Sequence, residues 1–164
     1  MANKNRLNKI ISKVYRLPPS LRPFALSQVL GRAVKFVGTS RIRVEKLTEQ
    51  ESVMVLANRK RVQNHIGGVH AAAMALLAET ATGFVVGMNV PDDKVPVIKS
   101  LKVNYLKRVT GGLRAVARLS DEQIEDILTT EKGEVLVDVS VTDDAGIEPI
   151  SCEMIWAWIP KKRN

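Results

Sequence analysis

One acidic residue, Glu79, interrupts the longest apolar stretch of the 164-residue chain, which runs from Val69 to Met88. Moving an ionised carboxylate out of water costs free energy, so such a group must find a partner, accept a proton or face a cleft. Buried acids with shifted pKa values gather at functional sites. The position of Glu79 therefore indicates either a functional acid or a structural carboxylate, paired with a strand lysine or a backbone donor.

A polar cluster lies just before or at the start of the same stretch and consists of Asn64, His65, Gly67, Gly68 and His70. Glycines let a backbone approach a ligand, and the amide N–H groups at a helix N-terminus suit a developing oxyanion. The alternative is a loop whose glycines permit a tight turn and whose Asn caps the helix. Both histidines of the chain fall here, but Cys152 is remote and no HExxH spacing exists, so no metal is expected.

The elements that must position these residues follow from hydrophobic periodicity. The Ala-, Leu- and Met-rich stretch predicts a buried helix rather than a membrane span, because an acid at its centre costs roughly 3 kcal/mol in a bilayer. Alternating apolar residues predict two strands before it, which turn near Glu49-Gln50, and four after it, with a short polar helix over 122–128. Hairpin-linked strands with one helix packed on the sheet predict an α+β fold.

The N-terminal segment is strongly basic. Residues 1–44 carry ten Lys or Arg and no acid, whereas the rest of the chain sums to −2 of the net +8. Helical spacing predicts one amphipathic helix around Leu7–Val14, a break at Pro18-Pro19 and a second helix over 21–37 that stops at Gly38. We expect an extension over 1–40 and a second domain over 41–160. The extension is expected to pack on that domain and shape a pocket, with an anionic membrane surface as the alternative.

Composition excludes several classes of protein. The chain is 45% hydrophobic and 26% charged, which rules out wholesale disorder, and one cysteine cannot close an internal disulfide. Aromatic residues are only 4% of the chain, and no helix-turn-helix pattern is evident, so no nucleic-acid partner is expected. Because no uninterrupted apolar segment follows the first charges, no secretory signal is expected. We therefore expect a cytoplasmic location.

The pattern Asn64-x5-His70-Ala71-x7-Glu79, at the mouth and middle of a buried helix, resembles the motif of hotdog-fold acyl-CoA thioesterases of the phenylacetate-degradation type. The resemblance extends from about residue 41 to 159. It implies a hotdog fold, in which a curved antiparallel sheet of about six strands wraps around one long buried helix. It also implies a homodimer, or a tetramer of such dimers, because the family's site is shared between subunits.

The resemblance also implies roles for individual residues. In that family the loop Asn and His position substrate and water, a backbone N–H after the His polarises the thioester carbonyl, and the helix acid is nucleophile or general base. These roles fall on Asn64, His70, the N–H of Ala71, and Glu79, although the family usually has Gly and Asp at the last two positions. The expected substrate-binding residues are His65, Gly67, Gly68, Ser100, Lys102, Lys107 and Arg108.

The expected activity is hydrolysis of a fatty or aryl acyl-CoA thioester to the free acid and coenzyme A, with no cofactor besides the coenzyme A of the substrate. The basic residues beside the strands are candidates for the coenzyme A phosphates, or else are solvated lysines that discourage aggregation. Two alternatives stay open. His65-x13-Glu79 has the spacing of hotdog hydroxyacyl dehydratases, and a non-catalytic acyl-CoA-binding regulator would use the basic segment to bind DNA.

Overall fold

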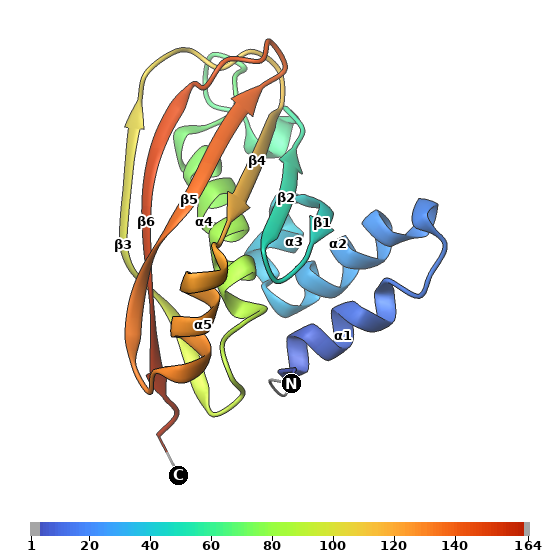
Figure 1. Ribbon diagram of the computed structural model, residues 1–164. Helices are drawn as coiled ribbons and strands as arrows, with labels where there is room; N and C mark the ends of the chain where they lie inside the picture. The colour runs from blue at the N-terminus through green and yellow to red at the C-terminus, as the bar shows by residue number, and fades with distance from the viewer. Residues whose placement is uncertain (1–3, 163–164) are drawn as a thin grey trace.

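A computed structural model describes residues 4–162 and contains one six-stranded antiparallel sheet (Figure 1). The strands lie in the order β1-β2-β4-β5-β6-β3. Their bounds are β1 (Arg43–Leu47), β2 (Glu51–Leu56), β3 (Lys94–Tyr105), β4 (Leu113–Arg118), β5 (Gly133–Asp143) and β6 (Ile150–Pro160). The predicted succession of two strands, one helix and four strands is confirmed, as is the α+β class.

The long helix α4 (Ala71–Gly87) packs against one face of the sheet and contacts β2 through β6 (Figure 1). Leu77, Ala81 and Val85 of this helix are fully buried, whereas Leu76 and Phe84 are only partly buried. The 3₁₀ turn η2 (Lys60–Val62) precedes α4, and α5 (Asp121–Thr129) is the predicted polar helix. Across residues 4–162, the helices are too short or too polar for any of them to span a bilayer.

The N-terminal segment forms α1 (Arg6–Val14), η1 (Pro19–Leu21), α2 (Arg22–Ala33) and α3 (Lys35–Ser40). The predicted single helix over 21–37 is wrong, because Val34 adopts an extended conformation (φ −118°, ψ 100°) between α2 and α3. A Cβ on Gly38 would lie 2.6 Å from the carbonyl oxygen of Gly31, so only glycine permits this approach. Gly38 is not the stop: α3 continues to Ser40 and ends at left-handed Arg41.

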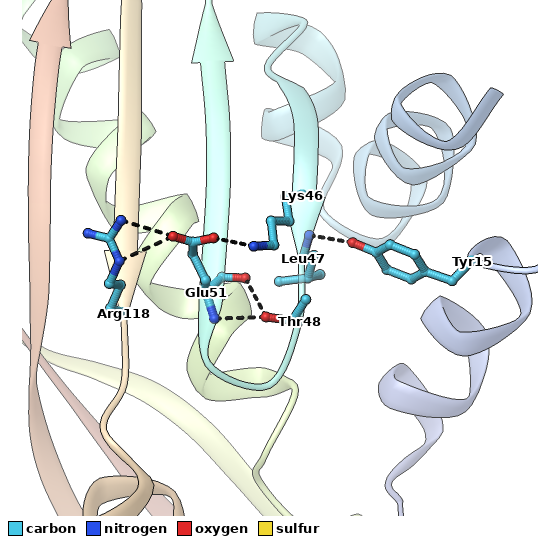
Figure 2. Close-up of polar contacts among 6 residues, drawn as sticks. All are labelled: Tyr15, Lys46, Leu47, Thr48, Glu51 and Arg118. Atoms are coloured by element: carbon cyan, nitrogen blue, oxygen red, sulfur yellow. Dashed lines mark hydrogen bonds and ion pairs between the residues drawn. The ribbon is translucent and has the colours of Figure 1, made fainter. Parts of the chain in front are cut away.

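These helices are joined to the sheet through apolar and polar contacts. Ile11, Leu26, Leu30 and Val37 belong to the same hydrophobic core as α4 and the strands. At the end of α1, the backbone N–H of Leu47 on β1 donates to the Tyr15 hydroxyl oxygen at 3.1 Å (Figure 2). The expectation that the segment packs on the domain is therefore confirmed, while the boundary at residue 40 stays a prediction.

The Glu51 carboxylate fixes the neighbouring end of the β1–β2 hairpin. It accepts from the Lys46 ammonium at 2.6 Å and from the Arg118 guanidinium at 2.9 Å, so it bridges β1, β2 and β4 (Figure 2). Thr48 closes the turn by exchanging hydrogen bonds with the backbone of Glu51. The Lys46 bond and the nearby charges lower the pKa of Glu51 below its ordinary value. The sheet edge against which α2 packs is thus held by polar contacts as well as by the core.

Strand β3 is an edge of the sheet, because it pairs with β6 alone. Its twelve residues are mostly exposed, and they include Val97, Ile98, Leu101 and Tyr105, which are 37–50% exposed. A long apolar edge strand is a template for pairing with another chain. The sheet therefore has one long edge strand with exposed apolar residues.

Candidate functional site

Glu79 lies in the middle of α4 and is half-buried. No ion pair to its carboxylate exists among residues 4–162; its one polar contact is a long bond, at 3.5 Å, from the Thr80 hydroxyl. Desolvation raises the pKa of Glu79 above its usual value, and the Thr80 hydroxyl opposes that shift. Within residues 4–162, no strand lysine therefore neutralises Glu79, and the structural alternative of a Lys–Glu79 ion pair is wrong.

Glu79 lines a cavity of about 560 Å³ between α4, the start of β3 and the N-terminal helices. The residues that line it are predominantly apolar, with Gly83, Phe84 and Gly87 from α4 and Trp156 from β6. Val34 and Val37 complete a wall from the N-terminal segment, so that segment shapes the cavity as expected. A volume of this size fits a small organic ligand.

Trp156 is held rigidly in the cavity wall. Its indole Nε1–H donates to the Thr82 hydroxyl at 2.9 Å, and its ring lies against Gly83. A Cβ on Gly83 would come within 2.6 Å of the ring, so this glycine is what lets β6 and α4 approach. Sequence reasoning missed Gly83, Gly87 and Trp156. The two glycines follow Glu79 at intervals of four residues, and this spacing in the sequence could have placed them on the same helix face as Glu79.

The loop before α4 is closed by its own hydrogen bonds. The Asn64 side-chain oxygen accepts from the backbone N–H of Ile66 at 3.0 Å and of Gly68 at 3.1 Å, and the backbone N–H of Asn64 donates to the Gly68 carbonyl. Gly67 has φ +79°, a conformation that favours glycine. The oxygen of Asn64 thus shapes the loop and does not cap the helix.

His70 caps α4 instead. Its Nδ1 accepts from the N–H of Ala72 at 3.0 Å, which places the proton of a neutral imidazole on Nε2. Ala71 is the first residue of the helix, and its carbonyl oxygen accepts from the Tyr105 hydroxyl at 2.8 Å. The N–H of Ala71 makes no hydrogen bond within residues 4–162. This amide is therefore available to polarise a carbonyl, with the helix dipole behind it.

The remaining predicted residues lie away from the cavity. His65 and Ser100 are exposed, and Lys102 forms an ion pair with Glu153 at 3.1 Å on the adjacent strand β6. Lys107 and Arg108 are exposed in the segment after β3. The Val109 side chain would lie 3.5 Å from a Cβ on Gly68, so this segment lies beside the loop before α4. The fold brings these two cations near the helix N-terminus.

The acid and the amide are separated within one chain. Ala71 and Glu79 are eight residues apart on α4, which corresponds to about 12 Å along the helix axis. None of Asn64, His70 and Ala71 lines the cavity at Glu79. The predicted residues therefore form two groups, one at the helix N-terminus and one at its middle. Over residues 4–162, no three His, Cys, Asp or Glu side chains are placed to hold a metal.

Comparison with known proteins gives a family and a fold. A family model described as "Domain of unknown function (DUF4442)" matches residues 23–159. A protein of unknown function from Pseudomonas aeruginosa, named "Probable Thioesterase", is 22% identical with a TM-score of 0.74, over 88% of this chain and 97% of that one. A thioesterase from Haemophilus influenzae is 15% identical with a TM-score of 0.66, over 84% of this chain and 90% of that one. A search of curated proteins found no match. The predicted hotdog fold is confirmed.

Proposed function

Because the chain belongs to the DUF4442 family and has the fold of solved thioesterases, we propose that it hydrolyses acyl-CoA thioesters to a free acid and coenzyme A. The observation that carries this proposal is Glu79, a half-buried acid without an ionic partner in residues 4–162 that lines an apolar cavity. A group in such surroundings is a stronger base than a solvated carboxylate, because desolvation disfavours its charged form.

In the proposed reaction the acyl group lies in the cavity and its carbonyl oxygen accepts a hydrogen bond from the N–H of Ala71. Glu79 removes a proton from water, the water oxygen attacks the carbonyl carbon, and negative charge develops on the carbonyl oxygen. Collapse of this intermediate breaks the C–S bond, and the sulfur leaves as the thiol with the proton that Glu79 had taken from water, which returns Glu79 to the carboxylate. Direct attack by the Glu79 carboxylate, followed by hydrolysis of the anhydride, gives the same products.

The site is proposed to form between two copies of the chain. The N–H of Ala71 is about 12 Å along the helix from Glu79 of the same chain, which is too far for one carbonyl group to contact both. The exposed apolar edge of β3 offers a surface on which a second copy could pair in a two-fold dimer. In such a dimer the amide of one copy meets the carboxyl group of the other.

Coenzyme A is proposed to bind outside the cavity, where Lys107 and Arg108 contact its phosphates. They lie on the segment beside the loop before α4, and both are exposed without an ion pair in residues 4–162. Lys102 is a weaker candidate, because Glu153 already neutralises it. A guanidinium and an ammonium suit a diphosphate, since charge-assisted hydrogen bonds are the strong ones.

A thiol-release assay over a panel of acyl-CoA substrates tests this function. We expect release by the wild type and a loss of roughly 100-fold or more in kcat for Glu79→Gln, the scale for removal of an acid–base group. Ala71→Pro deletes the N–H while a proline at the first helical position preserves the helix, so kcat should fall by about 100-fold. Ala71→Ser, which keeps the N–H, is its control. Equal rates for Glu79→Gln and wild type would remove Glu79 from the mechanism.

A further inference from the structure

The cavity at Glu79 extends in one direction only along α4. Its lining residues from this helix are Glu79, Thr80, Gly83, Phe84 and Gly87, and none comes from the turns between Ala71 and Glu79. Glu79, Gly83 and Gly87 follow one another at four-residue intervals, so they share one face of the helix. The cavity therefore runs from Glu79 toward the C-terminal end of α4, and the Trp156 ring, which covers Gly83, forms part of its wall.

The N-terminal helix α1 lies at the far end of this cavity. The Leu7 side chain would contact a Cβ placed on Gly87 at 3.5 Å, and Val90 and Val37 line the cavity with it. Leu7 is therefore the residue that a long apolar ligand would meet at the Gly87 end of the cavity, after passing the Trp156 ring.

Helix α1 is firmly held in this position. The buried Asn5 side chain donates to the carbonyl oxygens of Gly87 at 2.8 Å and Val90 at 2.6 Å, and its own oxygen caps α1 by accepting from Asn8 N–H. The Asn8 amide in turn donates to Glu49 at 2.6 Å. These bonds tie α1 to the end of α4 and to the β1–β2 turn, so Leu7 forms a fixed wall.

We propose, on the premise that the chain is a thioesterase, that α1 sets the length of the acyl group and that the preferred substrates carry unbranched, medium-length hydrocarbon chains. From Glu79 to Gly87 is about 12 Å along the helix axis. An extended hydrocarbon advances about 1.3 Å per carbon, given C–C bonds of about 1.5 Å, so this distance accommodates about nine carbons. Leu7 and Gly87 are the residues that determine specificity.

Several charged residues stand at the cavity rim, and Asp92, Lys94 and Lys161 have hydrogen-bond partners within the protein. The Asp92 carboxylate accepts from the backbone N–H of Arg6 at 3.0 Å, and the Lys161 ammonium donates to the carbonyl oxygen of Asp92. The Lys94 ammonium donates to the Thr130 carbonyl oxygen. The preference for a methyl terminus on the acyl chain rests on the apolar residues at the far end of the cavity, which are Leu7, Val37 and Val90.

Two substitutions with opposite effects test the proposal. Gly87→Leu fills the far end of the cavity and should move the best substrate to chains about three carbons shorter. Leu7→Ala frees space there and should move it to chains about two carbons longer. For each methylene group of the acyl chain that no longer fits in the cavity, kcat/KM should fall by about fourfold. Ile10→Ala, an exposed position of α1 that does not line the cavity, is the matched control and should leave the profile unchanged.

The readouts are the chain-length profile of thiol release, from acetyl-CoA to hexadecanoyl-CoA, and the affinity for saturated fatty acids of the same lengths. Opposite shifts of both profiles in the two variants support the proposal. An unchanged optimum in both variants overturns it, as does a preference for acyl groups ending in a carboxylate. No thiol release from any substrate would refute the thioesterase function, and the fatty-acid profile would then still decide whether α1 limits chain length.

Discussion

Replacing Gly83 with alanine perturbs the closest approach of α4 to the sheet. The new methyl group would lie 2.6 Å from one ring atom of Trp156 and 2.7 Å from a second, both inside contact distance. Trp156 is 8% exposed and its indole N–H is bonded to Thr82, so the ring cannot move without losing that bond. The substitution therefore forces either α4 or the indole out of place.

The expected cost can be worked out from these contacts. Overpacking costs about 1–3 kcal/mol, and leaving the buried indole donor unpaired costs about 1–3 kcal/mol. Alanine recovers up to about 1 kcal/mol, because glycine is the less favourable residue inside a helix. The net loss in the free energy of unfolding for Gly83→Ala is therefore about 1–5 kcal/mol, equivalent to a fall in Tm of about 2–20 °C for a chain of this size.

Urea unfolding followed by tryptophan fluorescence measures this loss, and it also reports on the environment of Trp156. Gly87→Ala is the control, since its new methyl group meets only Leu7, at an ordinary contact distance of 3.5 Å. That variant should be as stable as the wild type, or more stable by up to about 1 kcal/mol. If Gly83→Ala were as stable as Gly87→Ala, the rigid wall formed by Trp156 would be refuted.

Three further outcomes are expected. Glu79→Gln should raise Tm at pH 8, because the raised pKa of Glu79 means that the free energy of unfolding falls as pH rises through that pKa. The gain should vanish below pH 4.5, as thermal scans at both pH values would show. Burial raises the pKa of the Cys152 thiol to about 11, so about one thiol in a thousand is ionised at pH 8, and a disulfide reagent should react with the folded chain far more slowly than with the unfolded one. Asn5→Ala should lower the urea-unfolding free energy by about 2–3 kcal/mol, because it removes the α1 cap and leaves two carbonyls without their donor, whereas an unchanged value would mean that α1 is held by packing alone.

The sheet and α4 could be predicted from the sequence, because each rests on a local period. Val135, Val137, Val139 and Val141 alternate along β5, and the Ala- and Leu-rich run of α4 has no competing period. The break at Val34 could not be predicted, since it depends on the approach of Gly31 to Gly38, which only the folded chain brings together.

The candidate site was predictable by residue type but not by arrangement. The amino-acid sequence alone points to Glu79, because a lone acid in an apolar helix must offset the cost of its desolvation. The cavity beside it depends on residues far apart in the chain: Leu7, Val37 and Trp156 lie on three separate elements. For the polar loop before α4, the sequence showed which residues take part but not which contacts each of them makes. The residue pattern suggested that Asn64 caps the helix, and the family resemblance implied that it positions the substrate, yet its side-chain oxygen closes the loop and His70 is the cap.

The central claim is that the carboxyl group and the carbonyl-polarising amide come from different copies of the chain, and a subunit-mixing experiment tests it most directly. Glu79→Gln and Ala71→Pro are each expected to be nearly inactive alone. When the two variants are unfolded together in equal amounts and refolded, half of the dimers should contain both chains, and each of these should have one intact site. We expect recovery of about a quarter of the wild-type thiol-release rate, because half of the dimers have one intact site of two and neither variant alone has a residual rate near that value. A mixture no more active than its separate components would show that the two groups do not meet across a dimer.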